Sequence, residues 1–271
     1  MKNSFIALLT LFVAFFPDTA QSNERKFSYT YETSVLPPGA REIELWNTDR
    51  RGRSYFYRRL DQRIEYEFGV TNRLMSALYL NYSWRAKDSN DDGAGGAKST
   101  SYSISISNEW KYKLMDRVAD PFGFALYGEW TSGPDKNEVE AKLLFDKQMN
   151  NILVAFNAVA EQEWSYGVVN GDTEIEKEFI TEFDLGISYD ISTHFSAGVE
   201  ARQHSVYMGG ELKHSSLFAG PTVAVSTEYF WAVLTVQPQI KSFKGATTQN
   251  RLLDLGEYEK VQTRLLFSFH I

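Results

Sequence analysis

Charged side chains alternate with large apolar ones along much of this sequence, and the charged set could line a path for ions or polar solutes. In residues 63–68, Arg63, Glu65 and Glu67 share one parity, and three large apolar side chains share the other. Successive side chains of a β-strand point to opposite faces, so such a segment has one charged and one apolar face. The pattern fits a soluble sandwich with an apolar core, or a membrane barrel with its apolar face on lipid.

A second chemistry could come from His214 and Ser216, which have a His-x-Ser spacing. A serine nucleophile needs a base within reach and a third group that orients the base. Lipid hydrolases of the outer membrane place a His and a Ser with this spacing along a strand, but the rest of their motif is not evident here. We keep a lipid-modifying hydrolase as an alternative and assign no catalytic residue. Without cysteine, and with histidines that have no compact spacing, we expect neither a metal site nor a cofactor.

The N-terminus is typical of a secretory signal peptide. Lys2 precedes the apolar run 5–16, which is followed by a proline and small residues. Cleavage after Ser22 fits small residues at Ala20 and Ser22, and cleavage after Ala20 is the alternative. We therefore expect a signal peptide over residues 1–22 and an exported mature chain. The net charge of -7 argues against a nucleic-acid partner.

Beyond the signal peptide, the elements that must position these side chains are strands. No apolar run approaches the roughly 18 residues of a transmembrane helix, whereas alternating strands can cross a bilayer with neutral hydropathy. We predict about twelve strands, at residues 41–47, 56–68, 74–84, 101–114, 122–131, 138–146, 152–164, 174–189, 195–204, 216–225, 230–240 and 258–271.

The connections and the strand lengths favour a barrel over a sandwich. The links at 85–100, 166–173, 205–215 and 241–257 are longer and richer in Gly, Asp and Asn than those that alternate with them. Outer-membrane barrels have longer external loops and short periplasmic turns. Several strands keep their alternation for about ten residues, which is the length that a tilted strand needs to cross a membrane.

Large aromatic side chains gather near the ends of the predicted strands. The chain contains 15 Tyr, 19 Phe and 6 Trp. Barrels in lipid carry such residues at both membrane interfaces. The aromatic girdle that we predict consists of Trp84, Trp110, Tyr112, Trp130, Trp164 and Tyr189.

The last strand resembles the final strand of bacterial outer-membrane proteins. Val261, Leu265, Phe267 and Phe269 share one parity with the terminal Ile271, where that group usually has Phe. Residues 67–74 also resemble the strand-turn-strand units of porin-like proteins. The resemblance implies an all-β fold, namely a single transmembrane antiparallel up-and-down β-barrel over residues 41–271.

The same resemblance implies a location and partners. We expect residues 23–40 to form a periplasmic N-terminal segment, and both termini to lie in the periplasm of a bacterium whose outer membrane holds the barrel. The implied partners are outer-membrane lipid, periplasmic chaperones and the barrel-assembly machinery.

On this parity, the barrel interior receives mostly acidic charged side chains. The predicted lumen-facing residues are Glu42, Glu44, Arg63, Glu65, Glu67, Glu109, Lys111, Glu129, Glu140, Lys142, Glu161, Glu178, Glu182, Asp184, Glu200, Arg202, Lys260 and Arg264. Such an interior favours a passive channel or uptake protein for small polar or cationic solutes. If the charges pair across strands and fill a narrow lumen, the alternative is a non-conducting structural barrel.

Overall fold

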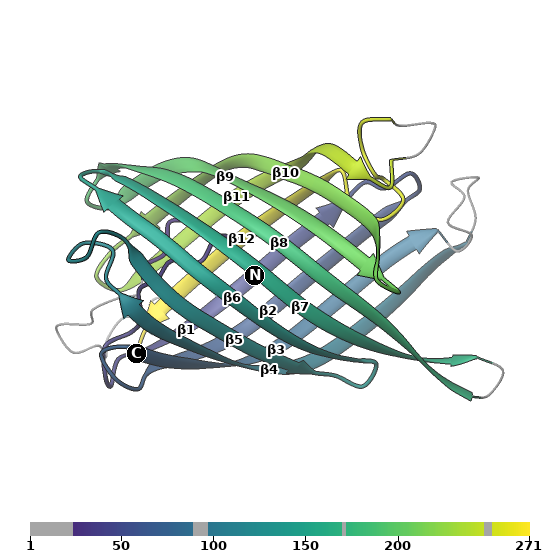
Figure 1. The fold of residues 1–271 in the computed structure, drawn as a ribbon, viewed down its shortest axis with the longest axis horizontal. Coiled ribbons are helices and arrows are strands. Elements are labelled where there is room, and N and C mark those ends of the chain that lie inside the picture. The colour runs from purple at the N-terminus through teal and green to yellow at the C-terminus, as the bar shows by residue number, and fades with distance from the viewer. Residues whose placement is uncertain (1–23, 89–96, 170–171, 247–250) are drawn as a thin grey trace, which may run out of the picture.

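Twelve antiparallel strands close into one barrel in the computed structural model of this chain, which describes residues 24–88, 97–169, 172–246 and 251–271 (Figure 1). Each strand pairs with the next along the chain, and the last pairs with the first. The strands are β1 (Arg41–Arg51), β2 (Tyr57–Gly69), β3 (Leu74–Asp88), β4 (Lys98–Met115), β5 (Gly123–Ser132), β6 (Lys136–Met149), β7 (Ile152–Val169), β8 (Asp172–Ser192), β9 (Phe195–Met208), β10 (Glu211–Ser226), β11 (Phe230–Lys244) and β12 (Val261–His270).

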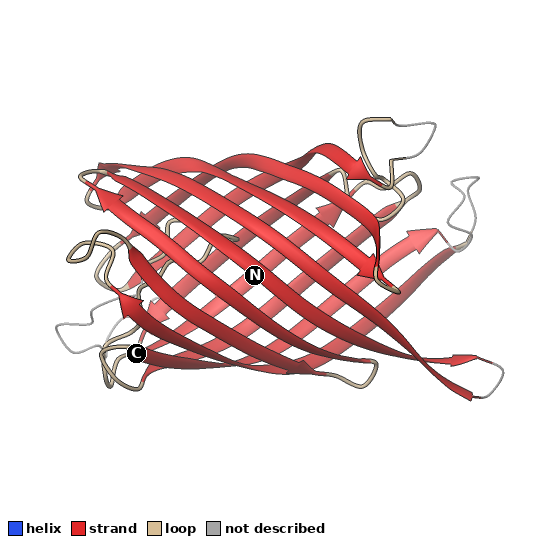
Figure 2. Cartoon of the chain, viewed as in Figure 1, coloured by secondary structure: helices blue, strands red, loops and turns tan. Residues whose placement is uncertain are grey.

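The prediction of an all-β up-and-down barrel of about twelve strands is confirmed, and the described residues form strands and loops without a helix (Figure 2). It follows that no described segment could cross a membrane as an apolar helix. The predicted signal peptide at 1–22 lies outside the described residues.

Several predicted boundaries are wrong. The expected long connection at 166–173 is reduced to residues 170–171, because β7 continues to Val169 and β8 begins at Asp172. The expected long connection at 205–215 is a two-residue turn, because Gly209 and Gly210 both take positive φ angles, of 59° and 81°, and let β9 and β10 continue to the turn. The last strand begins at Val261 rather than at residue 258, because Tyr258 and Glu259 turn inward and are buried.

The two ends of the barrel differ. The turn end carries the C-terminus, the start of β1 and the connections after β2, β4, β6, β8 and β10 (Figure 1, left). The loop end carries the other connections, among them the one between β11 and β12. The short links that were predicted for one side therefore all lie at the turn end.

The barrel wall is apolar outside and charged inside. On β2, the outward-facing Ile64 is 54% exposed, whereas its neighbour Glu65 is 1% exposed and points into the barrel. Isoleucine is among the most often buried residues in soluble proteins, and glutamate is almost never fully buried there. The outer band continues around the barrel through Leu78, Leu80, Ile104, Ile106, Val139, Phe183, Ile187, Val199 and Leu265.

Candidate functional site: the barrel lumen

Residues 24–40, here called the N-terminal segment, lie largely inside the barrel, and one carboxylate of the wall binds three of their backbone amides. Glu200 on β9 accepts hydrogen bonds from the backbone N–H groups of Ser28, Tyr29 and Thr30, at 3.1, 2.9 and 2.8 Å. Its Oε2 also accepts from the hydroxyl of Thr235, at 2.6 Å. Buried backbone donors need such partners, and bonds to a charged acceptor are the stronger ones.

Two further polar side chains of the wall bind the same segment. Asn157 on β7 accepts from the backbone N–H of Tyr31 at 2.7 Å and donates to its carbonyl at 2.9 Å. Asp146 on β6 accepts from both the backbone N–H and the hydroxyl of Thr33, at 2.9 and 2.6 Å. Strands β6, β7 and β9, which lie within one arc of the barrel wall, therefore bind successive parts of the segment.

Apolar packing fixes the segment as well. Phe27 is fully buried with Leu153 and Ala155 of β7, and it lies over Gly186 of β8. A Cβ at Gly186 would come within 2.7 Å of the Phe27 ring, so only glycine leaves room for it. Tyr31 joins a buried cluster that includes Trp46, Tyr127, Leu144, Trp231 and Leu266.

The N-terminal segment folds back on itself within the turn-end half of the lumen. Near its start, Lys26 forms an ion pair with Asp190 close to the end of β8, and near its other end Gly39 donates to the carbonyl of Gly69 at the end of β2. Between them, Tyr29 and Tyr31 reach far enough to line the cavity beyond.

The sequence placed residues 23–40 before the barrel, and the structure differs because the segment is an internal element. A signal for this was present. Phe27, Tyr29 and Tyr31 alternate with Ser28 and Thr30 just as a wall strand alternates. The inward Asp146 and Glu200 lie opposite only glycine or alanine on the neighbouring strands.

Beyond the N-terminal segment, toward the loop end, the lumen contains a cavity of about 430 Å³. Six arginines and two lysines line it, against eight glutamates and one aspartate. The cavity is therefore close to balanced in charge, unlike the acid excess expected for the whole interior. The two signs are separated, since most arginines lie on β1, β2 and β12 and most glutamates lie on β5 to β8.

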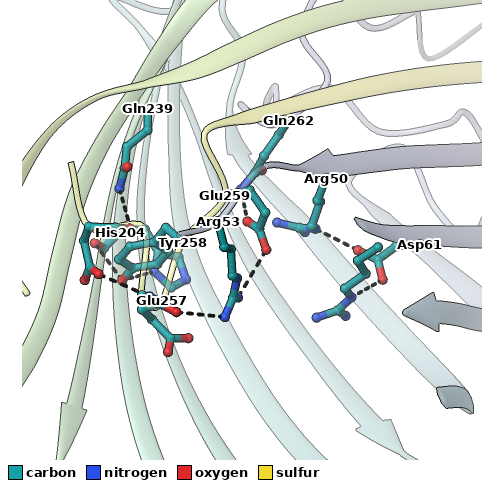
Figure 3. A network of polar contacts seen from close by, with 12 residues as sticks. Arg50, Arg53, Asp61, His204, Gln239, Glu257, Tyr258, Glu259 and Gln262 are labelled. Carbon is teal, nitrogen blue, oxygen red and sulfur yellow. Dashed lines mark hydrogen bonds and ion pairs between the residues drawn. The ribbon is translucent and has the colours of Figure 1, made fainter. Parts of the chain in front are cut away.

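Most arginines of the cavity wall are paired with acids (Figure 3). The Nε atoms of Arg50 and Arg59 lie 2.7 and 2.6 Å from the two oxygens of Asp61. Arg53 lies 3.3 Å from Glu259 in the connection between β11 and β12. Arg63 on β2 pairs with Glu129 on β5 at 3.5 Å, and Arg202 on β9 pairs with Glu182 on β8 at 3.1 Å.

The connection between β11 and β12 covers one side of the cavity. Tyr258 is buried beside His204, and its hydroxyl lies 3.1 Å from Nδ1 of that histidine (Figure 3). Burial and the nearby carboxylates of Glu257 and Asp254 raise the pKa of Tyr258. Although burial opposes the charge of Glu259, Arg50 and Arg53 outweigh it and hold the pKa of Glu259 below its ordinary value.

The acidic side of the cavity is partly neutralised by lysine. Glu138, Glu161 and Glu163 each bring one carboxylate oxygen within 4.8 Å of the others. The ammonium group of Lys136 contacts Glu138 and lies 2.9 Å from Glu163, so it pairs with two of these three carboxylates. Further along β6, Lys142 pairs with Glu140 at 3.0 Å.

A second set of acids, the turn-side carboxylates, is buried beside the N-terminal segment: Glu42, Glu44, Glu65, Glu67 and Glu109. Glu42, Glu44 and Glu67 could offer three oxygens to a cation. The segment supplies Arg25 to this region, stacked 4.2 Å from the Tyr31 ring. Although burial opposes its charge, Tyr31 and three of these glutamates outweigh it and raise the pKa of Arg25.

The predicted lumen-facing residues can now be placed. Buried inside the barrel are Glu42, Glu44, Glu65, Glu67, Glu109, Lys111, Asp184, Glu200 and Arg202. Lining the cavity are Arg63, Glu129, Glu140, Lys142, Glu161, Glu182, Arg202 and Arg264. Glu178 is half-buried on the inward parity of β8, near the loop end. Lys260 departs from the prediction because it precedes β12 and is exposed.

Sequence reasoning missed other residues of the site. Arg50, Arg53, Glu138 and Glu163 line the cavity but were assigned to connections or strand ends. Arg50 continues the parity of Glu42 and Glu44, so the alternation in residues 42–50 could have revealed it.

The predicted girdle residues all lie on the outward parity of their strands. Trp110, Tyr112, Trp130 and Tyr189 are exposed, and Trp84 and Trp164 are half-buried. The guanidinium of Arg58 lies over the Trp84 ring, at 6.0 Å.

The His-x-Ser pair does not form a dyad. The Nδ1 atom of His214 lies 2.7 Å from Asp254, and Ser216 is fully buried and accepts from the side-chain amide of Gln239 at 2.8 Å. Among the described residues, no hydrogen bond joins His214 to Ser216. A hydrolase of membrane lipid would need an accessible nucleophile bonded to its base, and this geometry offers neither.

Comparisons with known proteins bear on the fold and the family. A model of a family of unknown function, DUF6662, matches residues 19–271. Among solved structures, the chain is similar to the COG4313 outer membrane channel from Pseudomonas putida F1, with 11% identity and a TM-score of 0.60 over 90% of this chain and 100% of that chain. No sequence among the curated proteins matches this chain.

Two more barrels are similar at this level. The NanC porin gives 10% identity and a TM-score of 0.53, over 84% of this chain and 100% of its own. The β domain of the Bordetella autotransporter BrkA gives 8% identity and a TM-score of 0.54, over 86% of this chain and 100% of its own. The resemblance to outer-membrane barrels that the last strand suggested is therefore confirmed at the level of the fold.

Proposed function

We propose that this chain, which belongs to the DUF6662 family of unknown function, is an outer-membrane channel for small polar solutes that its own N-terminal segment constricts. The observation that carries the proposal is the inverted wall, with Ile64 exposed outside and Glu65 buried inside. Lipid can satisfy no backbone polar group, and a closed sheet is one of the two structures that can span it. A polar cavity inside such a wall is a place for solute.

The two halves of the lumen differ in the space that they leave for a solute. The cavity at the loop end is large enough for a small molecule. The turn-end half is filled by the N-terminal segment, which Glu200, Asn157 and Asp146 bind. Passage then requires this segment to move or leave. The related channel and porin folds are consistent with this role.

Any path past the turn end meets the turn-side carboxylates. They are five acids, and the basic side chains buried near them include Arg25, Lys111 and His270, whose Nδ1 lies 3.4 Å from Glu42. Displacement of the N-terminal segment would also remove Arg25. We therefore propose that the open barrel prefers cations. In planar bilayers with a salt gradient, the reversal potential should have the sign of cation preference, and anion preference would contradict this assignment.

We further propose that the turn end faces the periplasm and the loop end faces the outside of the cell. The absence of cysteine from the chain gives a clean background for labelling. Glu211 is exposed at the loop end, and Val118 is exposed at the turn end. We would replace each by cysteine in a separate variant, Glu211→Cys and Val118→Cys. In intact cells, a membrane-impermeant maleimide should label the first variant and not the second. The reverse result would invert the orientation, and a chain found only in the soluble fraction would refute the membrane location.

A further inference from the structure

We infer that the cavity binds a small zwitterionic solute, with the carboxylate of the solute at Arg264 and its ammonium group at Glu161. The inference rests on the proposed function for its setting and names the class of solute.

Arg264 on β12 differs from the other arginines of the cavity wall. Arg50, Arg53, Arg59, Arg63 and Arg202 each form an ion pair with a carboxylate. Within the described residues, Arg264 forms none. Its Nε donates to the hydroxyl of Thr48 at 2.9 Å, and its Nη1 donates to the carbonyl of Ser28 at 3.1 Å. A guanidinium has five N–H donors, so three of them are left without a bond to a described residue.

The guanidinium of Arg264 is also held in a fixed place. It lies 3.7 Å from the centroid of the Tyr29 ring and 5.3 Å from that of Trp46. Cation–π contacts and two hydrogen bonds restrict a side chain that is otherwise flexible. A fixed planar guanidinium with free donors is suited to bidentate binding of a carboxylate.

Arg50 and Arg202 add to the attraction for an anion at this point. Both line the cavity beside Arg264, and their positive charges act on it. Each of these neighbours is already bonded to an acid, Asp61 or Glu182. Because no acid of the described residues pairs with Arg264, we infer that an anion from outside the protein completes its charge balance.

Glu161 on β7 is the acidic counterpart of Arg264. It lines the same cavity, and the neighbouring Lys136 and Lys142 pair with Glu138, Glu163 and Glu140. Within the described part of the chain, Glu161 makes neither an ion pair nor a hydrogen bond. Strands β7 and β12 are five positions apart around the twelve-stranded ring, so the two side chains come from nearly opposite sides of the barrel wall.

A solute that satisfies both charges carries a carboxylate and an ammonium group at its two ends. We choose 6-aminohexanoate as the probe, because two analogues change one end at a time: 6-hydroxyhexanoate lacks the ammonium group, and 6-aminohexanol lacks the carboxylate. Calorimetric titration of the detergent-purified mature protein should give the tightest binding for the zwitterion.

The variants separate the two subsites. Arg264→Gln should weaken binding of 6-aminohexanoate and of 6-hydroxyhexanoate at least tenfold, and should leave 6-aminohexanol unchanged. Glu161→Gln should weaken binding of the zwitterion and of 6-aminohexanol, and should leave binding of 6-hydroxyhexanoate unchanged. The matched control is Arg58→Gln on β2, an exposed arginine outside the cavity lining, and its binding should match the parent protein. Arg264→Lys keeps the charge but not the fork, and should bind with intermediate affinity.

Two results would overturn the inference: no binding of 6-aminohexanoate to the parent protein, or equal binding by the parent and Arg264→Gln. Correct folding of each variant is checked by the shift of the unheated barrel on gel electrophoresis. Titration does not depend on conduction. Binding by a barrel that conducts no ions would therefore refute the channel and leave the solute site standing, and conduction without binding would do the opposite.

Discussion

At the scale of single residues, the N-terminal segment depends on side chains that no strand pairing requires. Glu200 binds three consecutive backbone amides, and Gly186 leaves room for Phe27. Neither residue is needed to form a strand, and a carboxylate costs free energy where it is buried. Their role is therefore to hold the segment, and their substitution should loosen the segment while leaving the barrel closed.

Gly186→Ala tests this most sharply. The added Cβ would overlap the Phe27 ring, and overpacking of this kind costs about 1–3 kcal/mol. We expect faster proteolysis of residues 24–36, with the barrel itself still resistant. The double variant Phe27→Ala with Gly186→Ala removes the overlap, so it should be no looser than Phe27→Ala alone. If Gly186→Ala left proteolysis unchanged, the position of Phe27 would be contradicted.

Glu200→Gln should act in the same direction. The amide brings only one acceptor oxygen, and its NH₂ group meets backbone donors, so we expect a loss of about 1–3 kcal/mol in docking of the segment. Proteolysis of residues 24–36 measures it. The control is Glu211→Gln, an exposed acid at the loop end that should have no effect.

At the scale of elements, the connection between β11 and β12 is held against the wall by a charge pair. Arg53 lies 3.3 Å from Glu259, and Gln262 donates to the same carboxylate at 3.2 Å. Because the folded-state pKa of Glu259 lies below the unfolded value of about 4.3, this stabilisation is present above that pH. It is lost as the pH falls through the folded pKa. The contribution of Glu257 to stability changes with pH in the opposite direction, because burial raises its pKa.

We therefore expect residues 251–260 to loosen in acid below about pH 4. Hydrogen exchange of their backbone amides, corrected for the intrinsic rate, should increase there. Glu259→Gln should produce the same increase at neutral pH, at a cost of about 1.5–3 kcal/mol, whereas Glu257→Gln should not. Equal exchange in the two variants would show that the Arg53–Glu259 pair does not hold this connection.

Elements also show which features could be predicted. Alternation identified all twelve strands, since a wall with apolar and charged faces repeats every two residues. It could not place the N-terminal segment, whose contacts with Glu200, Asn157 and Asp146 span more than a hundred residues of sequence. Nor could it show that Arg264 lacks an acid while Arg63 has one, because such pairing depends on rotamers across the lumen.

At the scale of the whole molecule, the barrel combines an apolar exterior, a polar cavity in its loop-end half, and a turn end filled by the chain's own N-terminal segment. A barrel of this kind should remain monodisperse only in detergent or lipid. We claim that the N-terminal segment, and not the barrel wall, limits passage of a solute.

Single-channel recording in planar bilayers tests that claim directly, using the full mature chain and a variant that lacks residues 24–36. The variant should show discrete steps several times larger than those of the full chain, because Tyr29, Tyr31 and Phe27 no longer occupy the lumen. Equal conductance of the two proteins, or none in either while both are folded in the membrane, would contradict the account.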